Sequence, residues 1–342
     1  MRRNIGKNGG MAVLFAAVTF AVLVLCVCVG SVRIPVGEVF SAVADGIRGR
    51  ALPGAVSGIV LRVRLPRALC AMLCGSALSL CGAAMQGLLR NPLADGSTLG
   101  VASGASLGAA AAILLGITFP GVPLAGTMVT AILFAFLSLV MILSLAFAMD
   151  RSLSTHTIIL IGIIYTMFVS SVMSLLVTFS GEKLRSITFW TMGSLSGVDY
   201  AQVLILFVTV LFCGGGLMLL SPELNAFSGG ERNAAHLGVD VKKVRFTVLV
   251  LVSVMVGVCV SVGGSIAFAG LVVPHILRRL TGPDHRKLLP ACFFGGAVFL
   301  MLCDLCARTL LSPVELPVGV VTSMIGAAVF VFIFYRTRKG GR

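Results

Sequence analysis

Runs of apolar residues, most of them about 20 residues long, fill the greater part of this 342-residue sequence. About 20 apolar residues in an α-helix span the hydrocarbon core of a bilayer, whereas a strand of a membrane barrel needs only about 10. The composition points the same way, since 58% of the residues are hydrophobic, 11% are charged and the mean hydropathy is +1.08. The sequence therefore predicts an all-α polytopic membrane protein and excludes a soluble globular domain.

The apolar runs divide into about ten transmembrane helices once one long run is split. Between Arg245 and Arg278 the sequence contains no charged residue. One straight helix over that stretch would be about 48 Å long, against a hydrocarbon core of roughly 30 Å. We expect a break at Gly263 and Gly264, because glycine ends helices readily. The predicted spans are residues 11–30, 66–88, 98–117, 124–148, 156–178, 200–220, 246–264, 268–280, 290–311 and 317–335.

Most of the net charge of +14 lies outside these spans, in the connecting loops and in the two tails. Lys and Arg gather beside the apolar runs, as the positive-inside rule describes, so the charge predicts topology and not a nucleic-acid partner. Ten spans place both termini on one side, and a cytoplasmic location for them puts most of the 26 basic residues in the cytoplasm. The start MRRNIGKNGG resembles a signal peptide, but no small-residue cleavage site follows, so we predict a retained first span.

The loop over residues 221–245 has the pattern of short helices and not of a slack linker. Pro222 suits a first helical turn, Glu231 is expected to begin a second helix, and Gly238 is expected to end it. Three apolar residues of this second helix are predicted to share one face: Ala234, Ala235 and Leu237. A compact, mostly polar helical loop on a membrane protein favours docking of a soluble partner, and an ordinary basic loop is the alternative.

Two patterns associated with catalysis or metal binding lack the residues that such chemistry requires. Gly104-Ala-Ser106-Leu-Gly108 has the spacing of a nucleophile elbow but lies in a predicted membrane helix, where small residues suit helix packing. Cys303 and Cys306 form a C-x-x-C without a second pair, and the ten cysteines lie almost wholly in apolar runs. We therefore expect no catalytic residue and no metal site in this chain.

Titratable residues near the spans have structural explanations. His275 and His285 do not form a metal site, and we predict packing and loop capping for them. Asp304 lies within a predicted span, four residues before Arg308, which is its expected ion-pair partner. A single intramembrane carboxylate gives little support to a proton relay.

Three long stretches resemble the permease subunits of ABC importers for iron–siderophore complexes, haem and vitamin B12, the type II ABC importers. They are Arg64-Leu-Pro-Arg67 with residues 75–109, residues 264–290, and residues 315–322. With the loop pattern of residues 230–238 and the predicted spans, the resemblance covers essentially the whole chain. It implies one transmembrane permease domain over residues 1–342, with a vitamin B12-permease-like bundle. Its non-spanning parts would be a cytoplasmic coupling loop at 221–245 and outer segments at 31–65 and 179–199.

The resemblance also implies an assembly in the bacterial cytoplasmic (inner) membrane, surrounded by lipid. Two copies of the permease, or this chain and a related permease, would enclose the translocation path. A periplasmic or lipid-anchored substrate-binding protein would dock outside, and two copies of an ABC ATPase would dock inside. Because the sequence has no G-x-x-x-x-G-K-[ST] motif, we expect that this chain is not an enzyme, binds no cofactor, and leaves ATP-Mg to the partner ATPase.

The resemblance assigns roles to three groups of residues. The coupling loop, which fits a cleft in the ATPase, would use Gly230, Glu231, Ala234, Ala235, Leu237 and Gly238. Salt bridges to the binding protein would use Arg64, Arg67 and Arg308, and arginines that snorkel at the membrane edge are the alternative. The cytoplasmic gate would use Asn91, Leu93, Ser154 and Thr155, with His156 where the family commonly has a small hydroxyl residue.

An iron–siderophore complex or similar metal chelate is the predicted cargo, with haem or cobalamin as the alternative. An ion-coupled secondary transporter is a more distant alternative, because it would need several intramembrane acids and an inverted repeat, and only Asp304 is present. An intramembrane enzyme would need a convergent Ser/His or His/Glu cluster, which the sequence does not contain.

Overall fold

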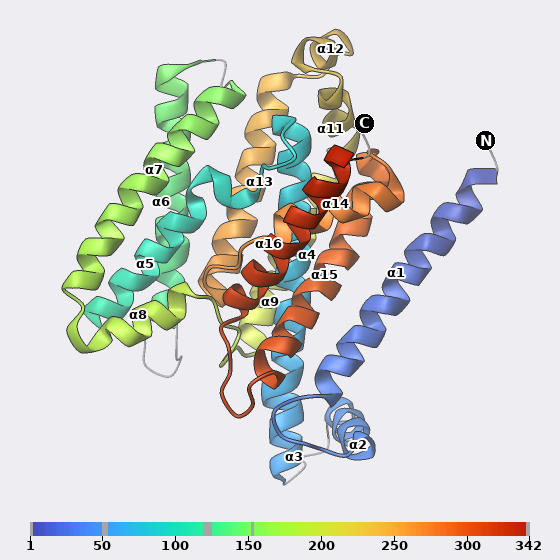
Figure 1. The fold of residues 1–342 in the computed structure, drawn as a ribbon, viewed down its shortest axis with the longest axis vertical. Helices are drawn as coiled ribbons and strands as arrows, with labels where there is room; N and C mark the ends of the chain where they lie inside the picture. Colours follow the sequence, from blue (N-terminus) through green and yellow to red (C-terminus); the bar gives the residue numbers. More distant parts are fainter. Residues whose placement is uncertain (1–2, 50–53, 119–124, 152–153, 340–342) are drawn as a thin grey trace.

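The computed structural model describes residues 3–49, 54–118, 125–151 and 154–339, and every regular element in these ranges is helical (Figure 1). The α-helices are α1 (Arg3–Cys28), α2 (Val36–Ile47), α3 (Ala55–Gly58), α4 (Leu65–Leu89), α5 (Val101–Leu115), α6 (Ala125–Met149), α7 (Thr155–Thr178), α8 (Leu184–Thr191), α9 (Tyr200–Thr209), α10 (Gly215–Leu219), α11 (Ser221–Ser228), α12 (Glu231–His236), α13 (Val241–Gly263), α14 (Ala269–Thr281), α15 (His285–Thr309) and α16 (Val318–Lys339). Two π-helical segments, η1 (Ile59–Arg64) and η4 (Val210–Gly214), and two 3-10 segments, η2 (Gly96–Leu99) and η3 (Gly181–Lys183), join some of them.

Seven helical segments within the described residues are long and apolar enough to cross a membrane. They are Gly10–Cys28, Ala55–Leu89, Ala125–Met149, Thr155–Thr178, Tyr200–Leu219, Val241–Gly263 and His285–Thr309. The other predicted spans correspond to shorter helices, namely α5, α14 and the apolar part of α16. The predicted all-α membrane fold is confirmed, and the exact number of spans stays a prediction.

The second span begins earlier than the sequence predicted. It was expected at residues 66–88 but is continuously helical over Ala55–Leu89, through α3, η1 and α4. At about 1.5 Å per residue this segment is about 52 Å long, so its α3 end extends past a core of roughly 30 Å. Pro66 did not mark the start because the π-helical turn before it provides room for a ring that would clash in a regular helix.

Helix α4 lies at the centre of the bundle, with α13, α14 and α15 around it (Figure 1). A methyl group at Gly75 would lie 2.2 Å from the Gly296 carbonyl oxygen on α15, and one at Gly82 would lie 1.7 Å from the Gly270 carbonyl oxygen on α14. The Ser76 hydroxyl donates to the Phe293 carbonyl across the first of these crossings, at 2.8 Å. Small residues on α4 therefore set the spacing of the bundle.

The glycines of the G-x-S-x-G pattern serve packing of α5 on α6. A methyl group at Gly104 would lie 1.7 Å from the Ser138 hydroxyl, and one at Gly108 would lie 2.5 Å from the Thr130 carbonyl oxygen. The Ser138 hydroxyl also hydrogen-bonds the Tyr165 hydroxyl on α7, at 2.5 Å. Helices α5, α6 and α7 thus form a group beside the α4 bundle (Figure 1).

The predicted break in the long apolar run is confirmed. Helix α13 ends at Gly263, Gly264 has a φ of 68°, and α14 begins at Ala269. The segment that connects α13 to α14 packs closely on the backbone of residue Gly193, where an added methyl group would lie 2.5 Å from the Ser265 carbonyl oxygen. Irregular backbone at membrane depth is tolerated where protein surrounds it in this way.

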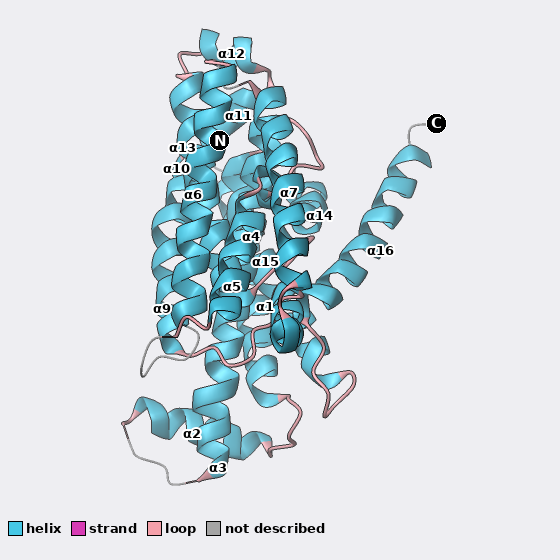
Figure 2. Ribbon diagram, turned by 90° about the vertical axis from the view of Figure 1, so that its left-hand side faces the viewer, coloured by secondary structure: helices cyan, strands magenta, loops and turns pink. Residues whose placement is uncertain are grey.

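The two ends of the bundle carry different elements (Figures 1 and 2). Helices α11 and α12 lie at one end, where α1 begins and α16 ends. Helices α2 and α3 lie at the opposite end. The segment 179–199 contains η3 and α8, and its predicted location on the outer side stays a prediction.

Candidate coupling helices, gate and outer arginines

The predicted coupling loop does form two short helices. Pro222 lies in the first turn of α11, and α12 begins at Glu231 as expected. Gly230 and Gly238, on either side of α12, have φ values of 101° and 86°. Side chains with a Cβ rarely adopt such values, so these glycines fix where α12 begins and ends.

The apolar residues of α12 do not share one face, which corrects the sequence prediction. Ala234 is fully buried, whereas Ala235 is exposed and Leu237 is 74% exposed. Adjacent residues are about 100° apart around a helix, so Ala234 and Ala235 cannot both point into the bundle. Ala234 therefore attaches α12 to the bundle, and Leu237 projects from a mostly polar surface at its end.

A buried arginine holds the start of α12. The Arg245 guanidinium lies 2.5 Å from the Glu231 carboxylate, and the Arg245 side chain is 1% exposed. Arg245 belongs to α13, which is a membrane-spanning helix. Movement of α12 is therefore tied to movement of α13 through this ion pair and the short connection between the two helices.

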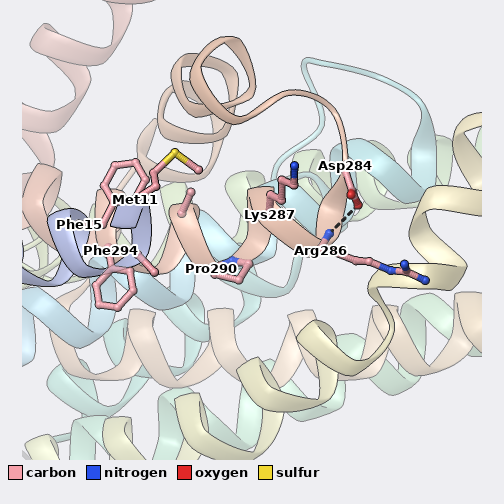
Figure 3. A pocket seen from close by; sticks show the side chains of 9 residues that line it. Met11, Phe15, Asp284, Arg286, Lys287, Pro290 and Phe294 are labelled. Carbon is pink, nitrogen blue, oxygen red and sulfur yellow. Dashed lines mark hydrogen bonds between the residues drawn. The ribbon is translucent and has the colours of Figure 1, made fainter. Parts of the chain in front are cut away.

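Helix α11 is attached to the start of α15 by a polar network. The Asn225 side-chain amide donates to the Asp284 carboxylate at 2.7 Å, and the Asn225 carboxamide oxygen accepts from the His285 backbone N–H at 2.8 Å. The His285 ring is buried against Gly87 of α4, where a methyl group would lie 2.4 Å from Nε2. Asp284 also caps α15 by accepting from the Arg286 N–H (Figure 3). Packing, as predicted, accounts for the His285 ring, whereas the cap of α15 comes from Asp284 and not from His285.

A cavity of about 800 Å³ separates α12 from the start of α7. Its wall brings together two groups that the sequence predicted separately, Ser154, Thr155 and His156 from the gate and Gly230 and Glu231 from the coupling loop. Ser154 is fixed by Asp150, whose carboxylate accepts from the Ser154 backbone N–H at 3.0 Å.

The other predicted gate residues, Asn91 and Leu93, do not line this cavity, although Leu89 and Arg90 do. The Asn91 carboxamide oxygen accepts from the Leu93 backbone N–H at 2.9 Å, which forms a turn directly after α4. Leu93 is 51% exposed. The structure therefore assigns these two residues a turn at the end of α4, and their role in a gate stays a prediction.

At the opposite end, Arg67 is the centre of a buried ion-pair cluster. Its guanidinium contacts the Asp304 carboxylate at 3.0 and 3.2 Å and the Glu315 carboxylate at 2.8 Å. Arg308, the partner expected for Asp304 from sequence spacing, lies at 3.6 Å. The main partner of Asp304 therefore comes from α4 and not from its own helix.

Arg64 and Arg308 are also buried, at 3% exposure each. Arg64 donates to the carbonyl oxygens of Val27 and Cys28, at 3.1 and 2.9 Å, and Arg308 donates to that of Cys26. All three predicted docking arginines thus have partners within the chain and do not snorkel into solvent. Their proposed contact with a binding protein stays a prediction.

No group of three or more His, Cys, Asp or Glu residues that could hold a metal ion occurs within the described part of the chain. Cys303 is buried and Cys306 is exposed, and both are free thiols.

The model of the FecCD transport family matches residues 18–336. The chain belongs to this family. Permeases of the FecCD family are subunits of type II ABC importers, so the chain is an ABC importer permease and a multi-pass protein of the inner membrane. Family membership also implies an ATPase partner and a substrate-binding protein.

Curated FecCD relatives resemble the chain over nearly its whole length. It is 40% identical over 324 residues to YvrB of Bacillus subtilis, an uncharacterized ABC transporter permease, covering 94% of this chain and 92% of YvrB. It is 40% identical to BtuC of Klebsiella pneumoniae, a vitamin B12 import permease, over 93% of this chain and 91% of BtuC. It is 37% identical to MolB of Haemophilus influenzae, a molybdate import permease, over 83% of this chain and 82% of MolB.

A solved ABC transporter assigned to the metal-chelate type, in an inward-facing conformation, has the same fold as this FecCD permease. The TM-score is 0.84 at 32% identity, covering 96% of this chain and 99% of the solved chain.

Three residues that position the predicted sites in this FecCD permease were not predicted from the sequence: Arg245, Glu315 and Asn225. Arg245 carried a detectable signal, since it is a charged residue at the edge of an apolar run, opposite an acidic residue in the adjacent loop. The sequence around Glu315 and Asn225 contains no such signal, because the residues that they contact are far away in the sequence.

Proposed function

We propose that this permease moves an iron–siderophore complex or a similar metal chelate into the cell. The observation that carries the cargo assignment is the likeness to the metal-chelate type transporter over 96% of the chain. The cargo would arrive as a complete chelate, so this chain would hold it through shape and weak polarity and would supply no metal ligand.

A stripe of hydroxyl groups on α7 supports a path for such a cargo. The exposed residues of the stripe are Ser170, Ser171, Ser174 and Thr178. The side chains of Ser171, Ser174 and Thr178 donate to carbonyl oxygens four residues earlier, at 2.9 to 3.1 Å. Helix α7 contains no Asp, Glu, Lys or Arg. An uncharged, weakly polar helix face suits transient contact with a large chelate better than a tight binding site. A second permease copy would cover this face and complete the path.

The proposal places the end that carries α12 in the cytoplasm, together with both termini. Two copies of the ATPase would bind ATP-Mg and receive Leu237 in their clefts, while this chain itself performs no catalysis. Movement of α12 would reach the membrane through Glu231 and Arg245, and α11 would move α15 through Asn225. The cavity beside Ser154 and His156 would change shape with these movements.

The binding protein would dock at the α2–α3 end. Arg62, just before the buried Arg64 and Arg67, is exposed, and so is Arg185 in the first turn of α8. We propose that Arg62 supplies charge to the docking surface. Arg64, Arg67 and Arg308 would then act by holding the ends of α1, α4 and α15 in place.

Cobalamin is the second candidate cargo, because the chain is 40% identical to BtuC of Klebsiella pneumoniae. The deciding experiment reconstitutes the permease with its ATPase and binding protein in proteoliposomes. Stimulation of ATP hydrolysis and uptake by a ferric siderophore, with no response to cobalamin or molybdate, would support the proposal. The reverse selectivity would replace it with the cobalamin assignment.

The ATPase contact is tested separately by Leu237→Glu in the same system. We expect loss of ATPase binding with unchanged thermal stability, because Leu237 is 74% exposed. Leu280→Glu is the control, since Leu280 is 67% exposed at the same end of the bundle. Equal ATPase binding by both variants would remove α12 from the contact.

A further inference from the structure

A groove between α1 and α15 is not used by the proposed transport path. It has a volume of about 420 Å³ and is lined by Met11, Ala12 and Phe15 on α1 and by Asp284, Arg286, Lys287, Pro290, Ala291 and Phe294 on or beside α15 (Figure 3). Helices α1 and α7 lie at opposite sides of the bundle, so the groove is remote from the hydroxyl stripe (Figure 1).

The groove is a wedge that narrows toward the α2–α3 end. There the two helices are joined, because the Cys26 thiol donates to the Met301 carbonyl and the Ser31 hydroxyl donates to the Arg308 carbonyl at 3.0 Å. Toward its N-terminal end α1 leans away from α15 (Figure 1). The remaining surface of this part of α1 is apolar and exposed, including Val13 at 69% and Leu14 at 61%. The wedge therefore opens to the lipid phase.

Polarity changes along the groove in the order found along a phospholipid. Met11, Phe15 and Phe294 lie together at one end, and Arg286 and Lys287 lie at the other (Figure 3). From Lys287 to Phe294 the distance along α15 is about 10 Å, which is the distance from a headgroup to the upper part of an acyl chain.

The two cations at the polar end are available to an anion. No carboxylate among the described residues lies within 4.0 Å of the Arg286 or Lys287 side-chain nitrogens. Asp284 is the one acid among the described residues that line the groove; its carboxylate accepts hydrogen bonds from Asn225 and the Arg286 backbone, and its charge interacts with those of Arg286 and Lys287 without forming an ion pair within 4.0 Å. Arg278 and Arg279 add positive charge in the last turn of α14, just before the connection to α15.

We propose that this groove binds one anionic phospholipid, with the phosphate at Arg286 and Lys287 and an acyl chain against Met11, Phe15 and Phe294. An apolar wall alone would accept any lipid, and the basic residues at its end select a negatively charged headgroup. Because Asp284 and Arg286 are adjacent to the contact with Asn225, the lipid would also steady the attachment of α11. The inference requires only the membrane location of the chain and does not depend on the proposed cargo.

The test is native mass spectrometry of the full-length permease, titrated in detergent with phosphatidylglycerol or with phosphatidylcholine of the same acyl chains. We expect one retained phosphatidylglycerol and weaker retention of phosphatidylcholine. Arg286→Gln with Lys287→Gln is expected to weaken phosphatidylglycerol binding about 30-fold at low salt, from the usual contribution of two basic residues. Lys242→Gln with Lys243→Gln removes the same charge from the exposed start of α13 and is expected to change nothing.

A second pair of variants tests the apolar part without changing charge. Ala12→Trp fills the groove and should displace the lipid, whereas Ala16→Trp, at an exposed position outside the groove, should not. Millimolar inorganic phosphate should leave the lipid bound, because it lacks the acyl chain. Equal binding of the two lipids, equal loss in the two charge variants, full binding by Ala12→Trp, or displacement by phosphate would each overturn the proposal.

Discussion

The Glu231 carboxylate at the start of α12 contacts the buried Arg245 guanidinium of α13 at 2.5 Å. This ion pair joins the helix proposed to contact the ATPase to a helix that spans the membrane. A short helix such as α12 has little stability of its own. Attachment to a buried charge gives it a fixed position, so force on its tip can move α13 as a rigid body.

Glu231→Gln is expected to lower transport while leaving the protein inserted in the membrane. Loss of one partner of a fully buried ion pair costs about 3–5 kcal/mol, but the Glu231 side chain is 35% exposed, so we expect a loss of about 1–2 kcal/mol in unfolding free energy. Uptake and thermal unfolding measure the two effects. Arg232→Gln, at the exposed neighbouring position, is the control, and equal uptake by both variants would remove the coupling role of the ion pair.

Arg67 and Arg62 are expected to respond differently to substitution. Arg67→Gln leaves the buried Asp304 without its nearest cation, and we expect a loss of about 3 kcal/mol in stability. Arg62→Gln should change stability by less than about 0.5 kcal/mol and weaken association with the binding protein, more so at low salt. A folded, fully stable Arg67→Gln variant that loses docking would show instead that Arg67 itself reaches the binding protein.

Gly82 is expected to tolerate no side chain. A methyl group there would lie 1.7 Å from the Gly270 backbone, which cannot move aside cheaply, so Gly82→Ala should cost about 3 kcal/mol or prevent accumulation. Gly215→Ala is the control, because the helical Gly215 has open space around it and should gain about 0.5–1 kcal/mol. Equal expression and melting temperature of the two variants would contradict the close crossing of α4 and α14.

Ionisation of Asp284 is expected to make the stability of the folded protein depend on pH. Burial acts to raise the pKa of this carboxyl, but hydrogen bonds from the Arg286 N–H and the Asn225 amide, together with the positive charges of Arg286 and Lys287, outweigh it and hold the pKa below the ordinary value of 3.8. A lowered pKa means that the contribution to stability is present above pH 3.8 and is lost as the pH falls through the folded-state value. The melting temperature of Asp284→Ala should therefore lie below that of the wild type at pH 7, and this difference in melting temperature should shrink below about pH 4. A constant difference over that range would exclude ionisation of Asp284 as its origin.

Local patterns in the sequence were sufficient for much of the fold. The two helices of the coupling loop followed from Pro222, Glu231 and Gly238, and the break between α13 and α14 followed from Gly263 and Gly264. Each of these depends on backbone preferences of a few adjacent residues. The extension of α4 back to Ala55 was missed because a π-helical turn offset the usual effect of Pro66.

The sequence by itself determined an all-α membrane protein of the FecCD family, its main helices and the residue types at its functional ends. Only the tertiary structure decided which of those residues are available to partners. Arg64, Arg67 and Arg308 are buried, and Ala234 is buried whereas Leu237 is 74% exposed. The physical reason is that exposure and ion pairing depend on contacts between helices remote in sequence. Asp304 pairs with Arg308 at 3.6 Å, as the local spacing predicted, but its nearer partner is Arg67 at 3.0 Å, which the close crossing of α4 and α15 supplies and no local spacing encodes.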